Sequence, residues 1–166
     1  MNRRKAQIAI LSLASGVAGP LCAADPPPLL VVAGRIRRTN DPDRKTYRFS
    51  EEEFLGLPQA SITTSTVWTP RSRFDGPRLL DVLKHVDAQG TELRLRALND
   101  YSITIPWSDL ERYQVILAHS RNGVRMAAST YGPLWLMYPR DEFPDELSGP
   151  VAGTKYIWQV RAIEVR

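Results

Sequence analysis

The stretch that decides the fold is YGPLWLMYP, residues 131–139, which carries no charge although 24% of the chain is charged. Gly132-Pro133 indicates a turn, because proline fixes φ and glycine adopts angles that other residues avoid. Residues 134–138 are too few for a helix and rich in aromatic rings, which predicts a buried strand. Pro139 ends this strand, since proline has no N–H for a neighbouring strand. Trp135 is therefore expected either in the core or at the mouth of a site.

Residues 1–24 have the pattern of a secretory signal peptide. Arg3-Arg4-Lys5 precedes an apolar run from Ala6 to Leu21, and Cys22-Ala23-Ala24 offers small residues for cleavage. The run is short for a membrane span. We expect cleavage after Ala23 or Ala24. Residues 25–166 would then form a single domain in the periplasm, without insertion into the membrane.

The composition of the mature chain excludes several classes of function. Cys22 is the only cysteine, so residues 25–166 contain no disulfide, thiolate metal ligand or cysteine nucleophile. The leader removes three basic residues from 22 and none of the 18 acidic ones, so the net charge falls from +4 to +1. A nearly neutral exported chain argues against a nucleic-acid partner.

Short strands and short helices follow one another irregularly. Strands are expected over 29–36, 45–49, 61–67, 93–97, 101–105, 115–119, 124–127, 134–138 and 155–165. Apolar and polar residues alternate in 93–97 and 101–105, and 61–67 is rich in β-branched residues. Helices are expected over 50–57 and 78–88 and for one or two turns from Ser108. Ser50 with Glu53, and Ser108 with Glu111, would form capping boxes. Segments 68–77 and 140–153 are expected to be loops, and Asn122-Gly123 a hairpin turn. Without regular βαβ alternation, this pattern predicts an α+β fold with a mixed or antiparallel sheet and a few short helices.

No catalytic or metal-binding set emerges from the residues. His85 and His119 are the only histidines, and neither has metal-ligand spacing to another ligand. The acidic residues within 140–153 do not place two carboxylates across a substrate. We therefore predict no catalytic residue and no metal ligand.

Three stretches do carry groups suited to a flat polar ligand. Residues 63–68 set four hydroxyls before the ring of Trp68, and residues 99–101 set an amide, a carboxylate and a phenol at a turn. Residues 131–139 add Tyr131 and Trp135. Taken alone, each stretch is better explained without a ligand: the first by an exposed threonine-rich strand, the second by ordinary turn chemistry and the third by core packing.

In this order, the stretches resemble the sulfite-oxidase-type molybdopterin-binding domain, from about Leu57 to Val165. FDGPRL at 74–79 matches an aromatic-x-Gly-x-x-Leu signature that opens a helix in that family. YGPLW at 131–135 matches a Gly-x-Pro-x-Arg strand, and WQVRAIEV at 158–165 matches the family's last strand. The resemblance implies the sulfite-oxidase-like fold.

Three departures from the family concern its cofactor. Thr64 stands approximately where the family has the molybdenum-binding cysteine, and a hydroxyl does not replace a soft thiolate. Trp135 and Trp158 stand where the family has an arginine and a lysine that hold the cofactor's phosphate. Indoles remove these anion partners and add stacking surface. The departures argue against a molybdenum cofactor and against an enzyme.

The chain is also similar to short exported relatives with Thr-Ser-Thr-x-Trp, Asn-Asp-Tyr and Gly-Pro-Leu-Trp segments, which stand here at 64–68, 99–101 and 132–135. Some of these relatives bind free reduced pterins. They act on the periplasmic part of an inner-membrane protein with diguanylate cyclase and phosphodiesterase domains. The resemblance thus implies a non-enzymatic periplasmic sensor of a neopterin-like pterin. The residues expected to bind the pterin are Thr64, Ser65, Trp68, Arg73, Asn99, Asp100, Tyr101, Tyr131 and Trp135.

The resemblance suggests roles for several of these residues. Asp100 would accept hydrogen bonds from the pterin's amino and ring N–H groups. Trp68 or Trp135 would stack on the ring, and Arg73 would bond its carbonyl or side-chain hydroxyls. Segment 140–153 would be the mobile surface that signals to the partner. Two other functions stay open: a molybdopterin-dependent oxidoreductase or one of its subunits, and an interaction module without a ligand.

Overall fold

A computed structural model describes residues 26–166, so the predicted signal peptide and Cys22 lie outside the described residues. The strands are β1 (Leu30–Gly34), β2 (Tyr47–Phe49), β3 (Gln59–Thr64), β4 (Ser72–Pro77), β5 (Glu92–Ala97), β6 (Ser102–Pro106), β7 (Ile116–Ala118), β8 (Ser120–Arg121), β9 (Val124–Arg125), β10 (Trp135–Met137) and β11 (Val160–Val165). The helices are α1 (Glu51–Leu55), α2 (Leu79–His85), α3 (Trp107–Tyr113), α4 (Pro144–Leu147) and α5 (Pro150–Gly153). The expected α+β class with short helices is confirmed.

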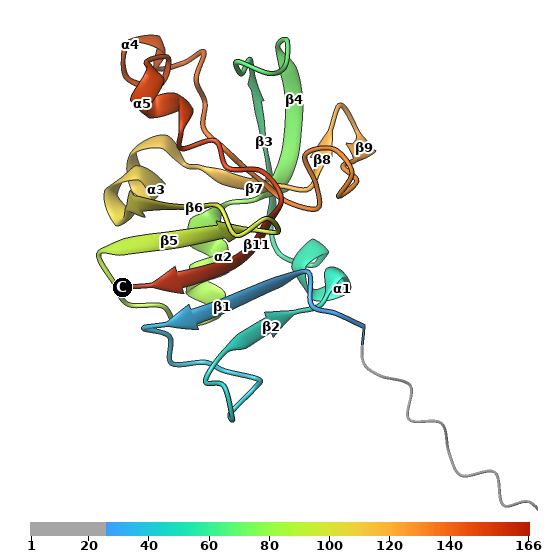
Figure 1. The fold of residues 1–166 in the computed structure, drawn as a ribbon, viewed down its shortest axis with the longest axis vertical. Helices are drawn as coiled ribbons and strands as arrows, with labels where there is room; N and C mark the ends of the chain where they lie inside the picture. Colours follow the sequence, from blue (N-terminus) through green and yellow to red (C-terminus); the bar gives the residue numbers. More distant parts are fainter. Residues whose placement is uncertain (1–25) are drawn as a thin grey trace, which may run out of the picture.

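The largest sheet has five strands in the order β2-β1-β11-β5-β6. Strands β1 and β11 are parallel, and the other neighbours are antiparallel. Side chains alternate across this sheet, so Leu93 and Leu95 of β5 are buried while Arg94 and Arg96 are exposed. Figure 1 shows α2 crossing behind β5 and β11. One face of the sheet therefore packs on the core and the other face stays open.

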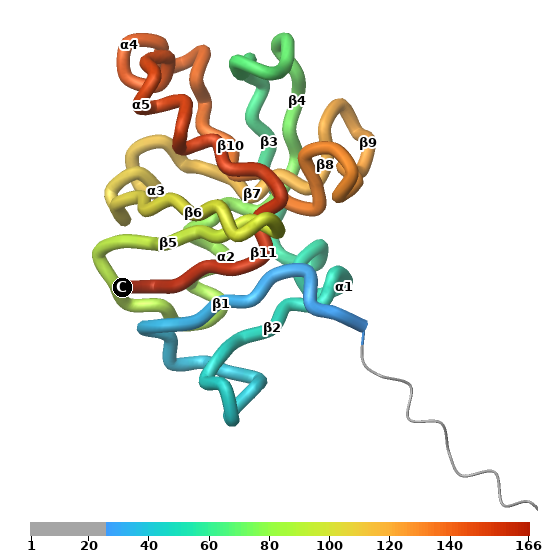
Figure 2. Tube along the Cα trace, viewed as in Figure 1, coloured from blue at the N-terminus to red at the C-terminus, as the bar shows by residue number. Residues whose placement is uncertain are grey.

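Two smaller sheets complete the fold. One has the order β3-β4-β8-β9, and the other pairs β10 with β7. The predicted hairpin turn is confirmed: Asn122 and Gly123 connect β8 to β9 with φ of 50° and 78°. The strand expected over 115–119 was to pair with 124–127, but its residues in β7 pair with β10 instead. All three residues of β10 are buried, as residues 134–138 predicted. Figure 2 shows β10 beside β7, in agreement with their antiparallel register.

Strand β4 lies where a loop was expected, so that prediction is wrong. It pairs with β3 along its whole length, from Gln59 opposite Pro77 to Thr64 opposite Ser72. Gly76 was taken for a turn residue, but it permits a close approach to β7. A Cβ at this position would lie 2.1 Å from the carbonyl oxygen of Leu117. Here glycine provides space for a neighbouring backbone within a strand.

Several predicted boundaries also need correction. Strand β3 ends at Thr64 rather than at residue 67, and β11 begins only at Val160 instead of residue 155. Segment 140–153 contains α4 and α5, each with a proline in its first turn.

The two capping boxes differ in outcome. The Ser50 cap is confirmed, because its hydroxyl accepts from the Glu53 N–H at 3.1 Å. The predicted cap at Ser108 is wrong, since α3 begins after Pro106 without a side-chain cap. Among the helices between residues 26 and 166, none has the length and apolar character needed to cross a membrane.

Candidate ligand-binding pocket

A pocket of about 700 Å³ opens where three connecting segments meet. These segments are the β3–β4 loop, the β5–β6 turn and the chain from α4 to the start of β11. No lining residue carries a charge. The aromatic and polar side chains in the lining are Trp68, Asn99, Tyr101, Ser148, Thr154, Tyr156 and Trp158.

Two indoles form one wall of the pocket. The rings of Trp68 and Trp158 meet edge to face, with centroids 4.6 Å apart and an interplanar angle of 79°. Trp68 remains 41% exposed, and Tyr101, which also lines the pocket, is 50% exposed. These rings have faces available to a ligand, and aromatic side chains with free faces are where flat heterocycles stack.

Trp135 lies behind this wall, in the core. It has no exposed surface, and its ring stacks on Tyr131 with centroids 4.3 Å apart. Its Nε1 donates to the Tyr156 carbonyl at 3.1 Å. Its centroid lies 6.1 Å from that of Trp158. Of the two positions that the sequence left open for Trp135, the structure has the core position, where the ring supports the pocket wall.

The β5–β6 turn brings two of its three predicted residues to the pocket. Asn99 and Tyr101 line it, and the Asn99 Oδ1 accepts from the Tyr101 N–H at 3.2 Å. Asp100 between them has φ of 65°, in the left-handed region. Its carboxylate pairs with Arg161 at 2.6 Å, and its side chain is 73% exposed. The Asp100 side chain is thus engaged outside the pocket lining.

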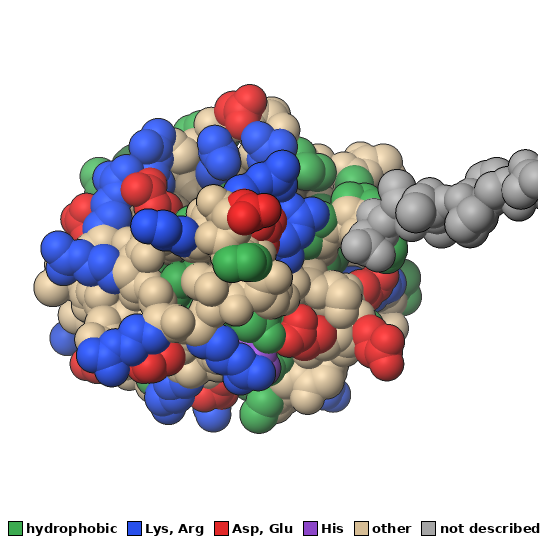
Figure 3. Space-filling view, turned by 90° about the horizontal axis from the view of Figure 1, so that it is seen from below, with side chains coloured by type: hydrophobic (Ala, Val, Ile, Leu, Met, Phe, Trp, Pro, Cys, Tyr) green, Lys and Arg blue, Asp and Glu red, His purple; other side chains and the backbone are tan. Residues whose placement is uncertain are grey.

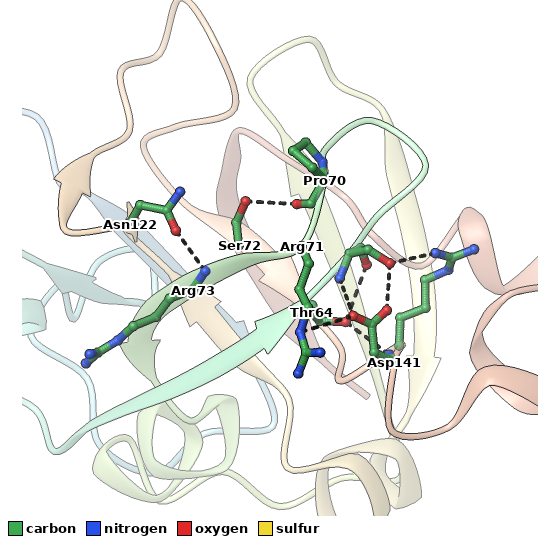
Figure 4. Close-up of polar contacts among 9 residues, drawn as sticks. Thr64, Pro70, Arg71, Ser72, Arg73, Asn122 and Asp141 are labelled. Carbon is green, nitrogen blue, oxygen red and sulfur yellow. Dashed lines mark hydrogen bonds and ion pairs between the residues drawn. The ribbon is translucent and has the colours of Figure 1, made fainter.

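Thr64 and Ser65 belong to a separate polar cluster (Figure 4). Thr64 is fully buried, and its hydroxyl accepts from the Asp141 N–H at 3.1 Å. The Asp141 carboxylate accepts from the Ser65 hydroxyl at 2.6 Å and from the Ser65 N–H at 2.9 Å. The hydrogen bond from the Ser65 hydroxyl holds the pKa of the Asp141 carboxyl below its ordinary value. The hydrogen bond from the Ser65 N–H and the positive charges of Arg71 and Arg140 act in the same direction. The polar groups of Thr64 and Ser65 are thus satisfied within the protein.

Arg73 lies apart from both the pocket and this cluster. Its Nε pairs with the Asp75 carboxylate at 2.8 Å, and its N–H donates to Asn122 at 2.9 Å. Figure 4 shows Arg73 and Asn122 on the side of β4 away from Asp141. The structure therefore brings Trp68, Asn99 and Tyr101 together and does not bring Arg73 to them.

Sequence reasoning missed the lining that follows α4. Ser148, Thr154 and Tyr156 lie in or after a segment that was expected to be a loop. The Gly149-Pro150 pair, which opens α5, was the available signal for a structured turn beside the site. Trp158 was noted as a departure from the family, but not as a wall of the pocket.

No family model matches the chain, and no curated protein sequence matches it. Among solved structures, the chain is similar to the crystal structure of the sulfane dehydrogenase SoxCD from Paracoccus pantotrophus, with a TM-score of 0.60 and 15% sequence identity. The match covers 82% of this chain and 37% of that chain, so this chain spans well under half of the protein it resembles. The likeness shows the fold, which is sulfite-oxidase-like, as the sequence predicted.

The residues present do not fit the molybdenum cofactor that this fold family implies. A thiolate ligand would be needed near Thr64, where the structure has a buried hydroxyl bonded to Asp141. A phosphate would need cations, and the pocket lining supplies none.

Proposed function

We propose that the protein binds a free, neopterin-like pterin in the periplasm and regulates an inner-membrane diguanylate cyclase and phosphodiesterase, without catalysing a reaction. The observation that carries this proposal is the uncharged aromatic pocket of about 700 Å³. Small-molecule sites are of this size, mostly apolar, with a few polar groups that fix the ligand's orientation. A pterin is flat and has a donor–acceptor edge, so it suits such a pocket.

The pocket offers separate groups for the ring and for its edge. Trp68 and Trp158 provide stacking faces, and stacking on an aromatic side chain contributes about 1–3 kcal/mol per base. The Asn99 amide nitrogen and the Tyr101 hydroxyl can bond the polar edge. The Thr154 hydroxyl donates to the Val151 carbonyl at 2.7 Å, so toward the ligand it can act as an acceptor. Without a lysine or arginine in the lining, the site favours a pterin that carries no phosphate.

Regulation requires that the ligand change the affinity for the partner. Helix α5 contributes Pro150 and Gly153 to the pocket, while Val151 between them is 79% exposed. The same four-residue helix therefore contacts the ligand site and presents an apolar side chain outward. We propose that α4 and α5, within segment 140–153, transmit ligand binding to the partner.

Ligand content and selectivity test the binding part of this proposal. The purified protein is heat-extracted for mass spectrometry, analysed for molybdenum, and titrated with neopterin, tetrahydroneopterin and adenosine. We expect a pterin to bind at least tenfold more tightly than adenosine. Trp107→Phe serves as the control for changes at the pocket indoles, because Trp107 is not in the lining. Equal affinities for pterin and adenosine would refute pterin recognition.

The fold likeness favours a second candidate, a molybdopterin-dependent oxidoreductase or a subunit of one. Stoichiometric molybdenum in the purified protein would support that candidate. The regulatory part of the proposal needs its own test. A neighbouring gene that encodes a membrane protein with cyclase and phosphodiesterase domains would identify the partner, and its periplasmic domain is then used for binding measurements. Its affinity should change at least fivefold when tetrahydroneopterin is added. An unchanged affinity would leave ligand binding without a regulatory role.

A further inference from the structure

The open face of the five-stranded sheet has a shallow groove whose floor is made of small side chains. Val31 and Ala33 of β1 and Ala162 of β11 face outward and line this hollow of about 360 Å³. The register places Val31 beside Ala162 and Ala162 beside Arg96. Short side chains between longer ones leave room above the strands for a second chain.

Arginines stand on the strands at both sides of this floor. Arg94 and Arg96 of β5 line the groove. Arg48 of β2 lies next to Val31 in the register, outside the lining, and pairs with Asp41 at 3.7 Å. The row from Arg48 through Val31 and Ala162 to Arg96 crosses four adjacent strands. Neighbouring strands lie about 4.8 Å apart, so the arginine backbones are about 14 Å apart. This width accommodates an extended chain.

The β5 arginines have no ion-pair partner among residues 26–166. Arg94 donates only to the Ser102 hydroxyl, at 3.2 Å. Glu164 of β11 also lines the groove, opposite Arg94, and its carboxylate pairs with Arg166 at 2.9 Å rather than with Arg94. Figure 3 shows the adjoining lower side of the molecule, where basic and acidic side chains are interspersed. In the groove itself, the lining has two unpaired arginines and one glutamate, which is paired with Arg166.

We propose that this groove binds an extended acidic segment of a partner protein. Arg94 and Arg96 are two residues apart on one strand, so their side chains leave the same face about 7 Å apart. Two acidic residues at positions i and i+2 of an extended segment have the same spacing. Each carboxylate would accept charge-assisted hydrogen bonds from one guanidinium, while the segment's backbone lies over Val31 and Ala162. The positive charge and the spacing of Arg94 and Arg96 therefore indicate a partner segment with two acidic residues at positions i and i+2.

A protein segment fits the groove better than other polyanions do. Membrane surfaces are bound by clusters of about four to eight basic residues. Double-stranded DNA binding commonly uses about six to ten phosphate contacts. This groove has two unpaired cations and an apolar floor, which matches a short peptide carrying two acids.

The groove and the pocket adjoin the same part of the chain without sharing a lining residue. Ala97 at the end of β5 lines the pocket, and Ile157 and Trp158 precede β11. The inference goes beyond the proposed function and does not depend on the pocket's ligand, because it rests on the sheet face alone.

An NMR titration with a defined probe tests the groove. The probe is the acetylated and amidated peptide Gly-Ser-Glu-Thr-Glu-Ser-Gly, and glutamine replaces both glutamates in its control. We expect the acidic peptide to shift amide resonances of β1, β5 and β11. In the double variant Arg94→Gln/Arg96→Gln the affinity should fall at least tenfold. The matched variant Arg37→Gln/Lys84→Gln, which removes two charges elsewhere, should bind as the wild type does.

Several outcomes would overturn the inference. These are no saturable shifts at millimolar peptide, equal affinity for the glutamine peptide, or shifts confined to other elements. Tighter binding of a DNA oligonucleotide or of phosphatidylglycerol vesicles, lost in the same Arg94/Arg96 variant, would assign the face to that polyanion instead. Pterin affinity is measured on the same variants. If these variants keep their pterin affinity, a failure of peptide binding counts against the groove alone and not against the proposed function of the pocket.

Discussion

The chain that leaves β3 enters two regions of opposite character. At Thr64 and Ser65 every side-chain hydroxyl is engaged, and Asp141 closes the cluster through three hydrogen bonds. A few residues later, Trp68 stands at an uncharged pocket with 41% of its surface exposed. Polar residues that satisfy one another stabilise a structure, whereas open aromatic faces leave binding energy for a ligand.

The difference separates a region that stabilises the fold from a region that is open to a ligand. The first region includes the position where the resembled family has a metal ligand, and it is closed by hydrogen bonds. The second region is open and lacks phosphate partners. If the first region stabilises the fold and the second binds the ligand, substitutions in the two regions have separable effects on the free energy of unfolding and on ligand affinity.

The largest effect is expected from Trp135→Ala, behind the pocket. Trp135 is fully buried and contacts Tyr131, Phe74 and Trp158 through its ring. Loss of such a ring leaves a cavity and costs about 3–5 kcal/mol of unfolding free energy. Urea denaturation measures this loss. Trp107→Ala is the comparison, because Trp107 lies outside the pocket lining. A change below about 1 kcal/mol would show that the pocket wall does not rest on Trp135.

The next largest effect concerns the open wall. Trp68→Ala should weaken tetrahydroneopterin binding by about 1–3 kcal/mol, because a stacking face is lost. Its effect on stability should be much smaller, since the ring is partly exposed. Calorimetric titration and urea denaturation of the same variant measure both quantities. A stability loss as large as that of Trp135→Ala would contradict the distinction between the two rings.

A smaller effect is expected in the polar cluster. Asp141→Asn removes a charge that accepts from Ser65, so it should cost about 1 kcal/mol at pH 7. The folded-state pKa of Asp141 is depressed. Its stabilisation is therefore present above the ordinary carboxyl pKa of about 4 and is lost as the pH falls through the lower folded value. Urea denaturation between pH 7 and pH 2 should show the wild type and variant converging. A constant gap, or a loss of pterin affinity, would place Asp141 in another role.

The smallest effects distinguish two neighbours on the β5–β6 turn. Asn99→Ala should weaken pterin binding by about 0.5–1.5 kcal/mol, because the amide lines the pocket. Asp100→Ala should change binding less, since that carboxylate pairs with Arg161 and is mostly exposed. Titration of both variants decides the order. A larger loss for Asp100→Ala would mean that its carboxylate leaves Arg161 to accept from the ligand, as the resemblance suggests.

The sequence predicted what depends on local patterns. An uncharged aromatic run identified β10, and Asn122-Gly123 identified a hairpin, because both signals lie within a few residues. Strand β4 was missed because Gly76 and Pro77 usually indicate turns, whereas here Gly76 meets the backbone of β7. A close approach between distant segments leaves no local pattern.

The candidate site shows the same limit. Trp68, Asn99 and Tyr101 were expected at the site because of the resemblance, and they line one pocket. Ser65 was expected to face the ligand, but its partner Asp141 lies 76 residues along the chain. Whether Trp135 lay in the core or at the mouth likewise depended on Tyr131 and Phe74, which only the fold brings to its ring.

One measurement tests the central claim most directly, the calorimetric titration of tetrahydroneopterin into the wild type and into the double variant Trp68→Ala/Trp158→Ala. We expect one pterin per wild-type chain. The double variant should lose at least about thirtyfold in affinity, as two stacking faces imply. It should keep a cooperative unfolding transition. Undiminished affinity in a folded double variant would contradict the assignment of this pocket as the pterin site.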